Sequence, residues 1–389
     1  MITVTELWSR LDALALPLPQ ERVPLSAALG RILAEPILAS EDQPAFDRSA
    51  IDGYLVNADQ AAGLVTLLGA VSPGSPSPAI APALGTAWRI LTGSALPATA
   101  AALVMQEDTR AVTRPDQREL LQAPSTRHIR RRASQARAGD RVLTPGQVLG
   151  PGALALLASL GVAQVRVSRR PRVAHLVTGG ELVAPEQVPA PGQIRDSNST
   201  LIAALLAEAG AELCWYRRVG DGRAAAAEAL AEALASPSDV ILVSGGASVG
   251  DHDHTGALLA ECGFTIHCDK VASRPGKPFI AAAREGRLAF GLPGNPLSHF
   301  VCYHLFVKRV LARLVGAAPI PLHRLTLAPG AALTSNPRET WWPAVATPAG
   351  YAPLPWADSS DLTVLARASA LLRVQADAPP DYTAEGLLV

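Results

Sequence analysis

The sequence predicts a multi-domain α/β protein whose central part is a doubly wound, mainly parallel α/β/α domain. Two observations support this prediction. Strand-like and helix-like apolar runs alternate between about residues 171 and 318, as expected for parallel strands joined by crossover helices. Between about residues 39 and 140, short strands separated by Pro, Gly and Ser favour a β-rich inserted domain.

The N-terminal segment is expected to be helical. Thr5 can cap a first helix, and Ser26 can cap a second helix over residues 27–33. A further helix is expected at residues 152–160, after the inserted domain. The two pieces that flank the insertion, residues 1–38 and 141–170, are therefore predicted to form one discontinuous helical domain.

The alternating region, residues 171–318, contains well-defined elements. A hairpin is expected at residues 279–290, and Asn295 and Pro296 suit the N-cap and first position of a long helix. Residues 319–389 return to strands and turns, which predicts a small C-terminal β-barrel-like domain. The expected strands cover residues 173–177, 213–219 and 240–243, and the expected helices cover residues 201–209, 224–235 and 297–314.

A glycine-rich turn at residues 244–253 follows one of these strands and precedes an apolar helix. Gly246 and Ser248 can contact an anion closely, because glycine has no Cβ and free amides gather at a helix N-terminus. Asp251 and Asp253 add hard oxygen ligands of the kind that Mg²⁺ prefers. The combination indicates a metal-bridged phosphoanhydride as the ligand.

Several acids follow predicted strands of the alternating region. Ligands of doubly wound sheets bind beyond the carboxyl ends of the strands, so these acids are expected at one edge. A single acidic residue in a loop often only stabilises a turn, but a group of such residues favours a shared site. The candidates are Glu181, Asp196, Asp221, Asp251 and Asp253.

Composition excludes several classes of protein. The 34 basic and 34 acidic residues cancel, so no global field attracts nucleic acid. No signal peptide begins the sequence and no apolar run is long enough to span a bilayer, so we expect a cytoplasmic protein without a membrane partner. The four cysteines lack the paired spacing of a metal site and are expected to be reduced.

Short motifs stand along nearly the whole chain in a specific order. They include Thr-Gly-Gly-Glu-Leu, Arg-Pro-Gly-Lys-Pro and Gly-Leu-Pro-Gly-Asn-Pro, and they occupy residues 46–54, 92–93, 105–107, 178–182, 196–198, 244–253, 274–278 and 291–296. In this order and spacing they resemble the molybdopterin molybdenumtransferase family, which is related to the E domain of gephyrin.

The resemblance implies an enzyme of molybdenum cofactor biosynthesis. Such an enzyme takes adenylylated molybdopterin, supplied by an upstream adenylylating protein, and molybdate. It cleaves the pyrophosphate link with Mg²⁺, leaves molybdenum on the dithiolene and releases AMP. The resemblance also implies a homodimer in which the inserted domain of one subunit closes the active site of the other.

The resemblance further implies roles for individual residues. Glu181, Asp221 and Asp253 match acids that act around Mg²⁺ and the pyrophosphate, and Asp52 and Thr92 match catalytic positions of the inserted domain. The expected substrate contacts are Ser49, Gly246, Ser248, Asp251, Arg274, Lys277, Pro293, Asn295, Pro296, Arg338, Ser359 and Ser360.

The chain departs from the family pattern at a few positions. Arg274 stands where lysine is usual, Gly180 replaces an acid, and residues 133–135 lack the common Gly-Glu-Asp. Two other functions stay open: adenylylation of molybdopterin by a similar α/β domain, and a catalytically weak dimeric scaffold. The additional N- and C-terminal domains argue against the first.

Overall fold

The computed structural model describes residues 1–99, 101–246, 254–376 and 384–389. The chain divides into two compact units. The large unit comprises Met1–Ala34, Pro145–Leu154 and Gln164–Val389, and the inserted unit comprises Glu35–Thr144 and Ala155–Ala163. The boundary between them passes through helix α2 (Pro151–Ser159).

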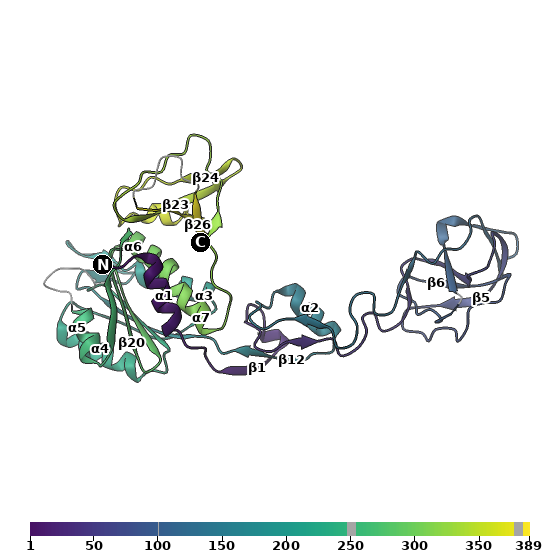
Figure 1. Ribbon diagram of the computed structural model, residues 1–389, viewed down its shortest axis with the longest axis horizontal. Helices are drawn as coiled ribbons and strands as arrows, with labels where there is room; N and C mark the ends of the chain where they lie inside the picture. The colour runs from purple at the N-terminus through teal and green to yellow at the C-terminus, as the bar shows by residue number, and fades with distance from the viewer. Residues whose placement is uncertain (100, 247–253, 377–383) are drawn as a thin grey trace. The chain divides into compact units, whose positions relative to one another are not determined.

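A six-stranded mixed sheet is the centre of the large unit (Figure 1). Its first four strands are parallel and its last two are antiparallel to their neighbours. The antiparallel pair β20–β21 is the expected hairpin. In spatial order the strands are β16 (Glu212–Val219), β13 (Arg172–Thr178), β17 (Val240–Ser244), β21 (Arg287–Leu292), β20 (Pro278–Arg284) and β18 (Thr265–Lys270).

Helices cover both faces of this sheet (Figure 1). Alternate strand residues serve the two faces: Leu242 packs under one helical layer, and its neighbour Val243 packs under the other. One layer contains α4 (Arg223–Ala235) and α5 (Thr255–Glu261). The other contains α1 (Val4–Leu14), α3 (Asn198–Glu208) and the continuous helix formed by α6 (Pro296–Cys302), a π-helical turn (Tyr303–Val307) and α7 (Lys308–Leu314).

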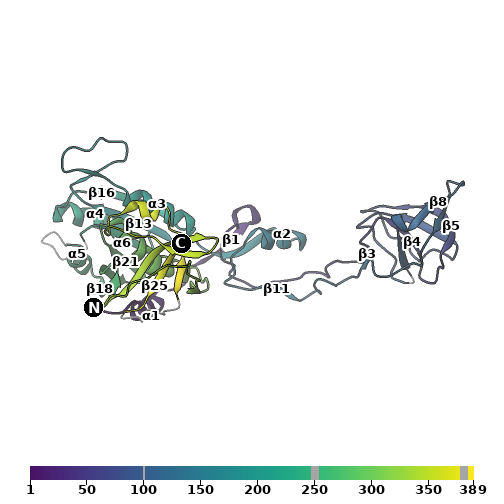
Figure 2. The ribbon, with the colours of Figure 1, turned by 90° about the horizontal axis from the view of Figure 1, so that it is seen from above.

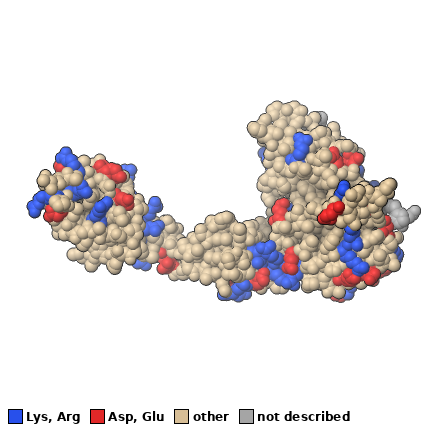
Figure 3. Space-filling view, turned by 180° about the vertical axis from the view of Figure 1, so that it is seen from behind, with Lys and Arg blue, Asp and Glu red and all other residues tan. Residues whose placement is uncertain are grey.

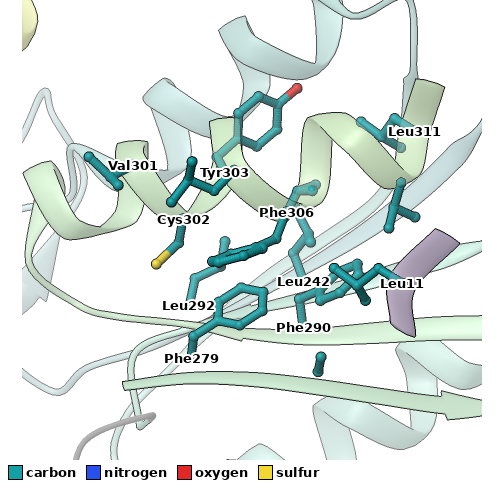
Figure 4. Packing of buried hydrophobic residues seen from close by; sticks show 14 of the residues in the cluster. Leu11, Leu242, Phe279, Phe290, Leu292, Val301, Cys302, Tyr303, Phe306 and Leu311 are labelled. Carbon is teal, nitrogen blue, oxygen red and sulfur yellow. The ribbon is translucent and has the colours of Figure 1, made fainter. Parts of the chain in front are cut away.

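Aromatic rings fill the core beneath the second layer (Figure 4). The ring of Phe279 lies 4.5 Å from that of Phe306 and 5.7 Å from that of Phe290, measured between centroids. All three side chains are fully buried. Truncating one such ring costs about 3–5 kcal/mol, so this cluster anchors the long helix on the sheet.

The N-terminal predictions need two corrections. Helix α1 is capped by Thr3, not Thr5: the Thr3 hydroxyl accepts from the Glu6 amide at 3.1 Å, and the Glu6 carboxylate accepts from the Thr3 amide at 2.8 Å. The helix expected over residues 27–33 is absent. Only a 3₁₀ turn forms at Leu25–Ala27, because the following backbone bonds to a distant segment.

That distant segment explains the missing helix. Gly30 adopts a φ of +73°, which ends any helix there, and its amide donates to the Leu149 carbonyl at 2.9 Å. The Leu33 amide donates to the Gln147 carbonyl at 2.9 Å. An antiparallel ribbon of β1 (Gln20–Pro24) and β12 (Gln164–Ser168) lies in the same part of the large unit.

A second sheet, formed mainly by C-terminal residues, completes the large unit. Its first strand, β19, comes from the central region and pairs in parallel with β23, so the two parts of the unit are joined by main-chain pairing. The strands are β19 (Ser273–Arg274), β23 (Glu339–Thr347), β25 (Ala370–Val374), β26 (Glu385–Leu388) and β22 (His323–Arg324), with β24 (Gly350–Pro353) on β23 and the short helix α8 (Leu362–Leu365) nearby in the sequence.

The inserted unit is built on another six-stranded sheet (Figure 2). Separate apolar clusters around Tyr54 and Leu55 pack on its two faces. Two short ribbons, β3–β10 (Arg48–Ser49 with Ile129–Arg130) and β2–β11 (Ile37–Leu38 with Arg141–Leu143), belong to the same unit. The sheet strands are β7 (Ala101–Met105), β4 (Gly53–Asn57), β6 (Thr86–Ile90), β5 (Gly63–Val71), β9 (Gln117–Leu120) and β8 (Thr109–Ala111).

The surface of the protein carries charges of both signs. Basic and acidic side chains are interspersed over the face drawn in Figure 3, and most of that face is neither. Within the described ranges, no helix has the length and apolar character needed to cross a bilayer. All four cysteines are free thiols.

Candidate active site

A cleft of about 840 Å³ opens in the large unit where β13, β17 and β21 end. Residues from the central sheet and from the C-terminal segment line it together, which is the position expected for a ligand site in this type of sheet. Most of the sequence-predicted residues of the large unit meet here. They are Glu181, Asp196, Asp221, Gly246, Arg274, Lys277, Pro293, Asn295, Pro296, Arg338, Ser359 and Ser360.

The start of the glycine turn forms part of the cleft wall. Gly245 has a φ of +89°, and a Cβ at this position would lie 2.4 Å from the Thr178 carbonyl oxygen. Gly246 also has a positive φ, of +60°. Glycine is therefore required for the strand end to turn this close to β13. The other predicted residues of this turn, Ser248, Asp251 and Asp253, lie outside the described residues.

Two exposed carboxylates, those of Glu181 and Asp221, lie on the cleft. Asp221 accepts a hydrogen bond from the Gly180 amide through Oδ2 at 2.9 Å. A Cβ on residue 180 would approach this same oxygen to 3.0 Å, so glycine here allows the contact. The bond orients one carboxylate oxygen of Asp221 and leaves the other available to a ligand.

Asp196 has a different role from these two acids. It is only 3% exposed, and its carboxylate accepts from the Ser199 amide at 3.0 Å and from the Ser199 hydroxyl. The Tyr216 hydroxyl also donates to it, at 3.4 Å. These bonds hold the first turn of α3, so the Asp196 side chain supports the cleft wall rather than presenting a free ligand atom.

Four cationic side chains line the cleft: Arg195, Arg274, Lys277 and Arg338. Arg338 donates through Nη1 to the Ser273 carbonyl at 2.9 Å, which ties it to the strand that carries Arg274. Among the described residues, neither Arg274 nor Lys277 forms an ion pair. Their charge is therefore available to an anionic ligand.

The loop before α6 is held by side chains from two directions. Asn295 precedes the helix as predicted, but it makes no side-chain cap bond. The side-chain amide of Asn295 donates instead to the Ser359 hydroxyl at 2.7 Å. The backbone amide of Leu297 donates to the Ser359 carbonyl at 3.0 Å. The side-chain amide of Asn198 donates to the Gly294 carbonyl at 2.7 Å. Pro296 occupies the first turn of the helix as expected.

Two buried histidines support residues of the cleft wall. His175 lies 2.7 Å through Nε2 from the Ser244 hydroxyl oxygen, and burial lowers the pKa of His175 to about 3. His299 lies 3.0 Å through Nδ1 from the Pro293 carbonyl, and burial lowers its pKa to about 4. Both rings are neutral at pH 7. A carbonyl only accepts, so Nδ1 carries the hydrogen of His299.

The remaining candidates lie in the inserted unit. Asp52 accepts through Oδ1 from the Thr92 amide at 2.7 Å and from the Thr92 hydroxyl at 2.9 Å. These hydrogen bonds lower the pKa of Asp52, so it is ionised at neutral pH. Ser49 is 1% exposed, and its hydroxyl donates to the Ile51 carbonyl at 2.7 Å. That bond stabilises the turn that leads to Asp52.

Comparison with known proteins shows to which family the chain belongs. Residues 2–161 match the model of the MoeA N-terminal region (domains I and II), and residues 174–313 match that of a probable molybdopterin-binding domain. A molybdopterin molybdenumtransferase from Nostoc sp. is 38% identical over 310 residues, which cover 77% of this chain and 70% of the relative. The chain belongs to the molybdopterin molybdenumtransferase family.

Other relatives agree with this family of enzymes. A molybdopterin molybdenumtransferase from Staphylococcus aureus is 33% identical over 318 residues, 78% of this chain and 73% of the relative. The crystal structure of a molybdopterin biosynthesis moeA protein from Pyrococcus horikoshii OT3 matches with a TM-score of 0.82 and 26% identity, and it covers 100% of this chain and 98% of the other. The multi-domain mixed α/β fold is thus that of known molybdopterin biosynthesis proteins.

Sequence reasoning missed several residues that shape the site of this family member. His175 and His299 gave no signal, because a histidine in an apolar run is usually a core residue. Asn198 stands within a motif, but its bond to the backbone of residue 294 is long-range. Trp356 also lines the cleft, and only its closeness to the serines at 359 and 360 could have indicated it.

Proposed function

We propose that this chain transfers molybdenum from molybdate to adenylylated molybdopterin, with cleavage of the pyrophosphate link and release of AMP. The main support is one observation: the carboxylates of Glu181 and Asp221 line the same cleft as Arg274 and Lys277, which have no ion-pair partner among the residues that the structure describes. The proposed substrates are both anionic, and one of them carries a phosphoanhydride. A site with cations and separate carboxylates suits that pair of substrates.

Mg²⁺ is proposed to act at the carboxylates. Within the described residues, no group of three or more His, Cys, Asp or Glu side chains is placed to hold a metal ion. Glu181 and Asp221 still fit Mg²⁺, which is usually bound by one or two carboxylates together with waters and substrate phosphates. When bound, the ion neutralises phosphate charge and polarises the phosphoanhydride. Asp253 is proposed as a further ligand.

The residues of the chain position the reacting groups. Arg274, Lys277 and Arg338 are proposed to bind molybdate and substrate phosphate oxygens by charge-assisted hydrogen bonds. The amides around Gly246, with Ser248 and Asp251, are proposed to contact the phosphates. Ser359, Ser360, Pro293, Asn295 and Pro296 are proposed to shape the cleft around the pterin and molybdate. These contacts orient both substrates, which accounts for much of the rate enhancement in such reactions.

The inserted unit is proposed to act across a homodimer. Asp52 is ionised and exposed, and it is held by Thr92 in a fixed geometry. Such a pair suits a role beside a second copy's cleft, where it would complete the catalytic set. Ser49 would then act by supporting Asp52. An adenylylating protein upstream would supply the pterin substrate.

The experiment is an AMP-release assay with purified protein, adenylylated molybdopterin, molybdate and Mg²⁺. We expect AMP to appear, with a requirement for molybdate and loss of activity when Mg²⁺ is chelated. Consumption of ATP with unmodified molybdopterin would instead identify an adenylyltransferase. A stable dimer that releases no AMP under any of these conditions would contradict the proposal and favour a scaffold.

A further inference from the structure

The guanidinium of Arg274 lies over the indole ring of Trp356. Its central carbon is 5.7 Å from the ring centroid, a cation–π distance. Both side chains are half-buried and both line the cleft. Trp356 belongs to the C-terminal segment and Arg274 to the central region, so the contact joins two distant parts of the sequence at the site.

Trp356 is itself held in place by a second tryptophan. Its ring meets that of Trp342 edge to face, with centroids 5.8 Å apart and an interplanar angle of 68°. Trp342 belongs to β23, the strand with which β19 pairs, and Arg274 pairs there with Thr340. The backbone of Arg274 and the ring beneath its side chain are therefore both fixed to the same strand.

The hydrogen-bond donors of Arg274 are free in the part of the chain that the structure describes. No carboxylate or carbonyl there accepts from its guanidinium, whereas Arg338 is tied to the Ser273 carbonyl and Arg373 to Glu339. A cation–π contact uses none of the N–H donors of a guanidinium, so these stay available for hydrogen bonds. An arginine held in this way can present two parallel N–H bonds to an oxyanion.

We propose that Trp356 is a positioning residue that fixes the plane of Arg274, so that Arg274 binds a tetrahedral oxyanion through two N–H groups. This inference rests on the proposed function, in which the oxyanion is either molybdate or a phosphate of the pterin substrate. Lysine in place of Arg274 would keep the charge but lose the paired donors. Trp356 thus determines how well the cleft discriminates an oxyanion by shape.

The test measures anion binding with variants of both residues. Trp356→Leu removes the ring, and Trp356→Phe keeps a smaller aromatic face. Arg274→Lys keeps the charge but removes the paired N–H donors. Dissociation constants for molybdate and for inorganic phosphate are measured by calorimetry as separate arms. We expect Trp356→Leu to weaken binding of at least one anion by about threefold to tenfold, and Trp356→Phe to restore most of it.

A double-variant cycle separates positioning from general damage. Once Arg274→Lys is present, adding Trp356→Leu should change anion binding by less than about twofold, because the paired N–H donors are already lost. The matched control is Trp215→Leu, a half-buried tryptophan of β16 outside the cleft, which should leave both dissociation constants unchanged. Thermal unfolding of each variant confirms that it folds.

Steady-state kinetics identifies the anion and separates this inference from the proposed function. A raised KM for molybdate, with kcat nearly kept, assigns the contact to molybdate, and a raised KM for adenylylated molybdopterin assigns it to the phosphate. Anion binding that depends on Trp356 without AMP release would sustain the inference while the proposed function fails. Unchanged binding in Trp356→Leu, independent effects in the cycle, or no binding of either anion to the wild type would overturn it.

Discussion

The side-chain amide of Asn295 donates to the hydroxyl of Ser359 at 2.7 Å, across 64 positions of the sequence. This bond ties the loop before α6 to the C-terminal segment at the cleft. We predict that Asn295→Ala and Ser359→Ala each raise the KM for molybdate by a few fold, about 1 kcal/mol. The double variant should resemble either single one. Multiplied effects in steady-state assays would show that the two residues act separately.

The carboxylate of Asp221 is predicted to be essential for turnover. Asp221→Asn keeps the size of the side chain but removes the charge that suits Mg²⁺, so kcat/KM should fall about a hundredfold. The Mg²⁺ concentration needed for half-maximal AMP release should rise. Asp269→Asn changes an exposed acid of β18 away from the cleft and should leave both values unaltered. Equal activity of the two variants would remove Asp221 from the mechanism.

The glycine at 245 is predicted to be irreplaceable for folding of the turn. Gly245→Ala places a Cβ 2.4 Å from the Thr178 carbonyl oxygen at a φ of +89°. The free energy of unfolding, measured in urea, should fall by about 2 kcal/mol or more. Gly152→Ala, in α2 with no atom within 4 Å of the new Cβ, should instead raise it slightly. A stable Gly245→Ala protein would contradict the close approach described.

A buried histidine away from the cleft predicts how stability depends on pH. Burial lowers the pKa of His304 to about 3, whereas an unfolded histidine has a pKa of about 6.5. Between these values the unfolded state binds a proton that the folded state does not, so stability falls as pH falls. This one residue should lower the free energy of unfolding by about 2 kcal/mol between pH 8 and pH 5.

His304→Phe tests that dependence directly. Phenylalanine fits the ring's aromatic surroundings beside Phe300 and Tyr303, and it also removes the unpartnered Nε2. Urea unfolding at pH 8 and pH 5 should show a loss of stability that is smaller in the variant by about 2 kcal/mol. An identical pH dependence in both proteins would mean that His304 is not held neutral by burial.

The sequence was a good guide where local patterns determine structure. The hairpin over residues 279–290 follows from strand-like runs around Glu285, and the rim position of Glu181 and Asp221 follows from the alternation of strands and helices. It failed where distant segments decide. Gly30 bonds to residue 149 instead of continuing a helix. Asn295 occupies the predicted N-cap position, but its side chain bonds to Ser359 and not to the helix. The local sequence preferences give no information about either of these distant partners.

The same limit applies to the proposed oxyanion site. Arg274 and Lys277 were recognisable as cations in a proline-stiffened loop, but the ring in cation–π contact with Arg274 comes from more than eighty positions away. Aromatic residues at such separations give no periodic signal. The pairing of β19 with β23 places Arg274 beside the strand of Trp342, on whose ring Trp356 packs.

The cleft is expected to bind an oxyanion beside the carboxylates of Glu181 and Asp221. Tungstate, a heavy tetrahedral analogue of molybdate, tests it most directly through anomalous diffraction from soaked crystals. We predict a tungsten peak on the cleft that Glu181 and Asp221 also line, placed so that tungstate oxygens lie within hydrogen-bond distance of Arg274 or Lys277. Tungstate bound only elsewhere on the protein, or no peak at saturating concentration, would show that this cleft does not bind the oxyanion.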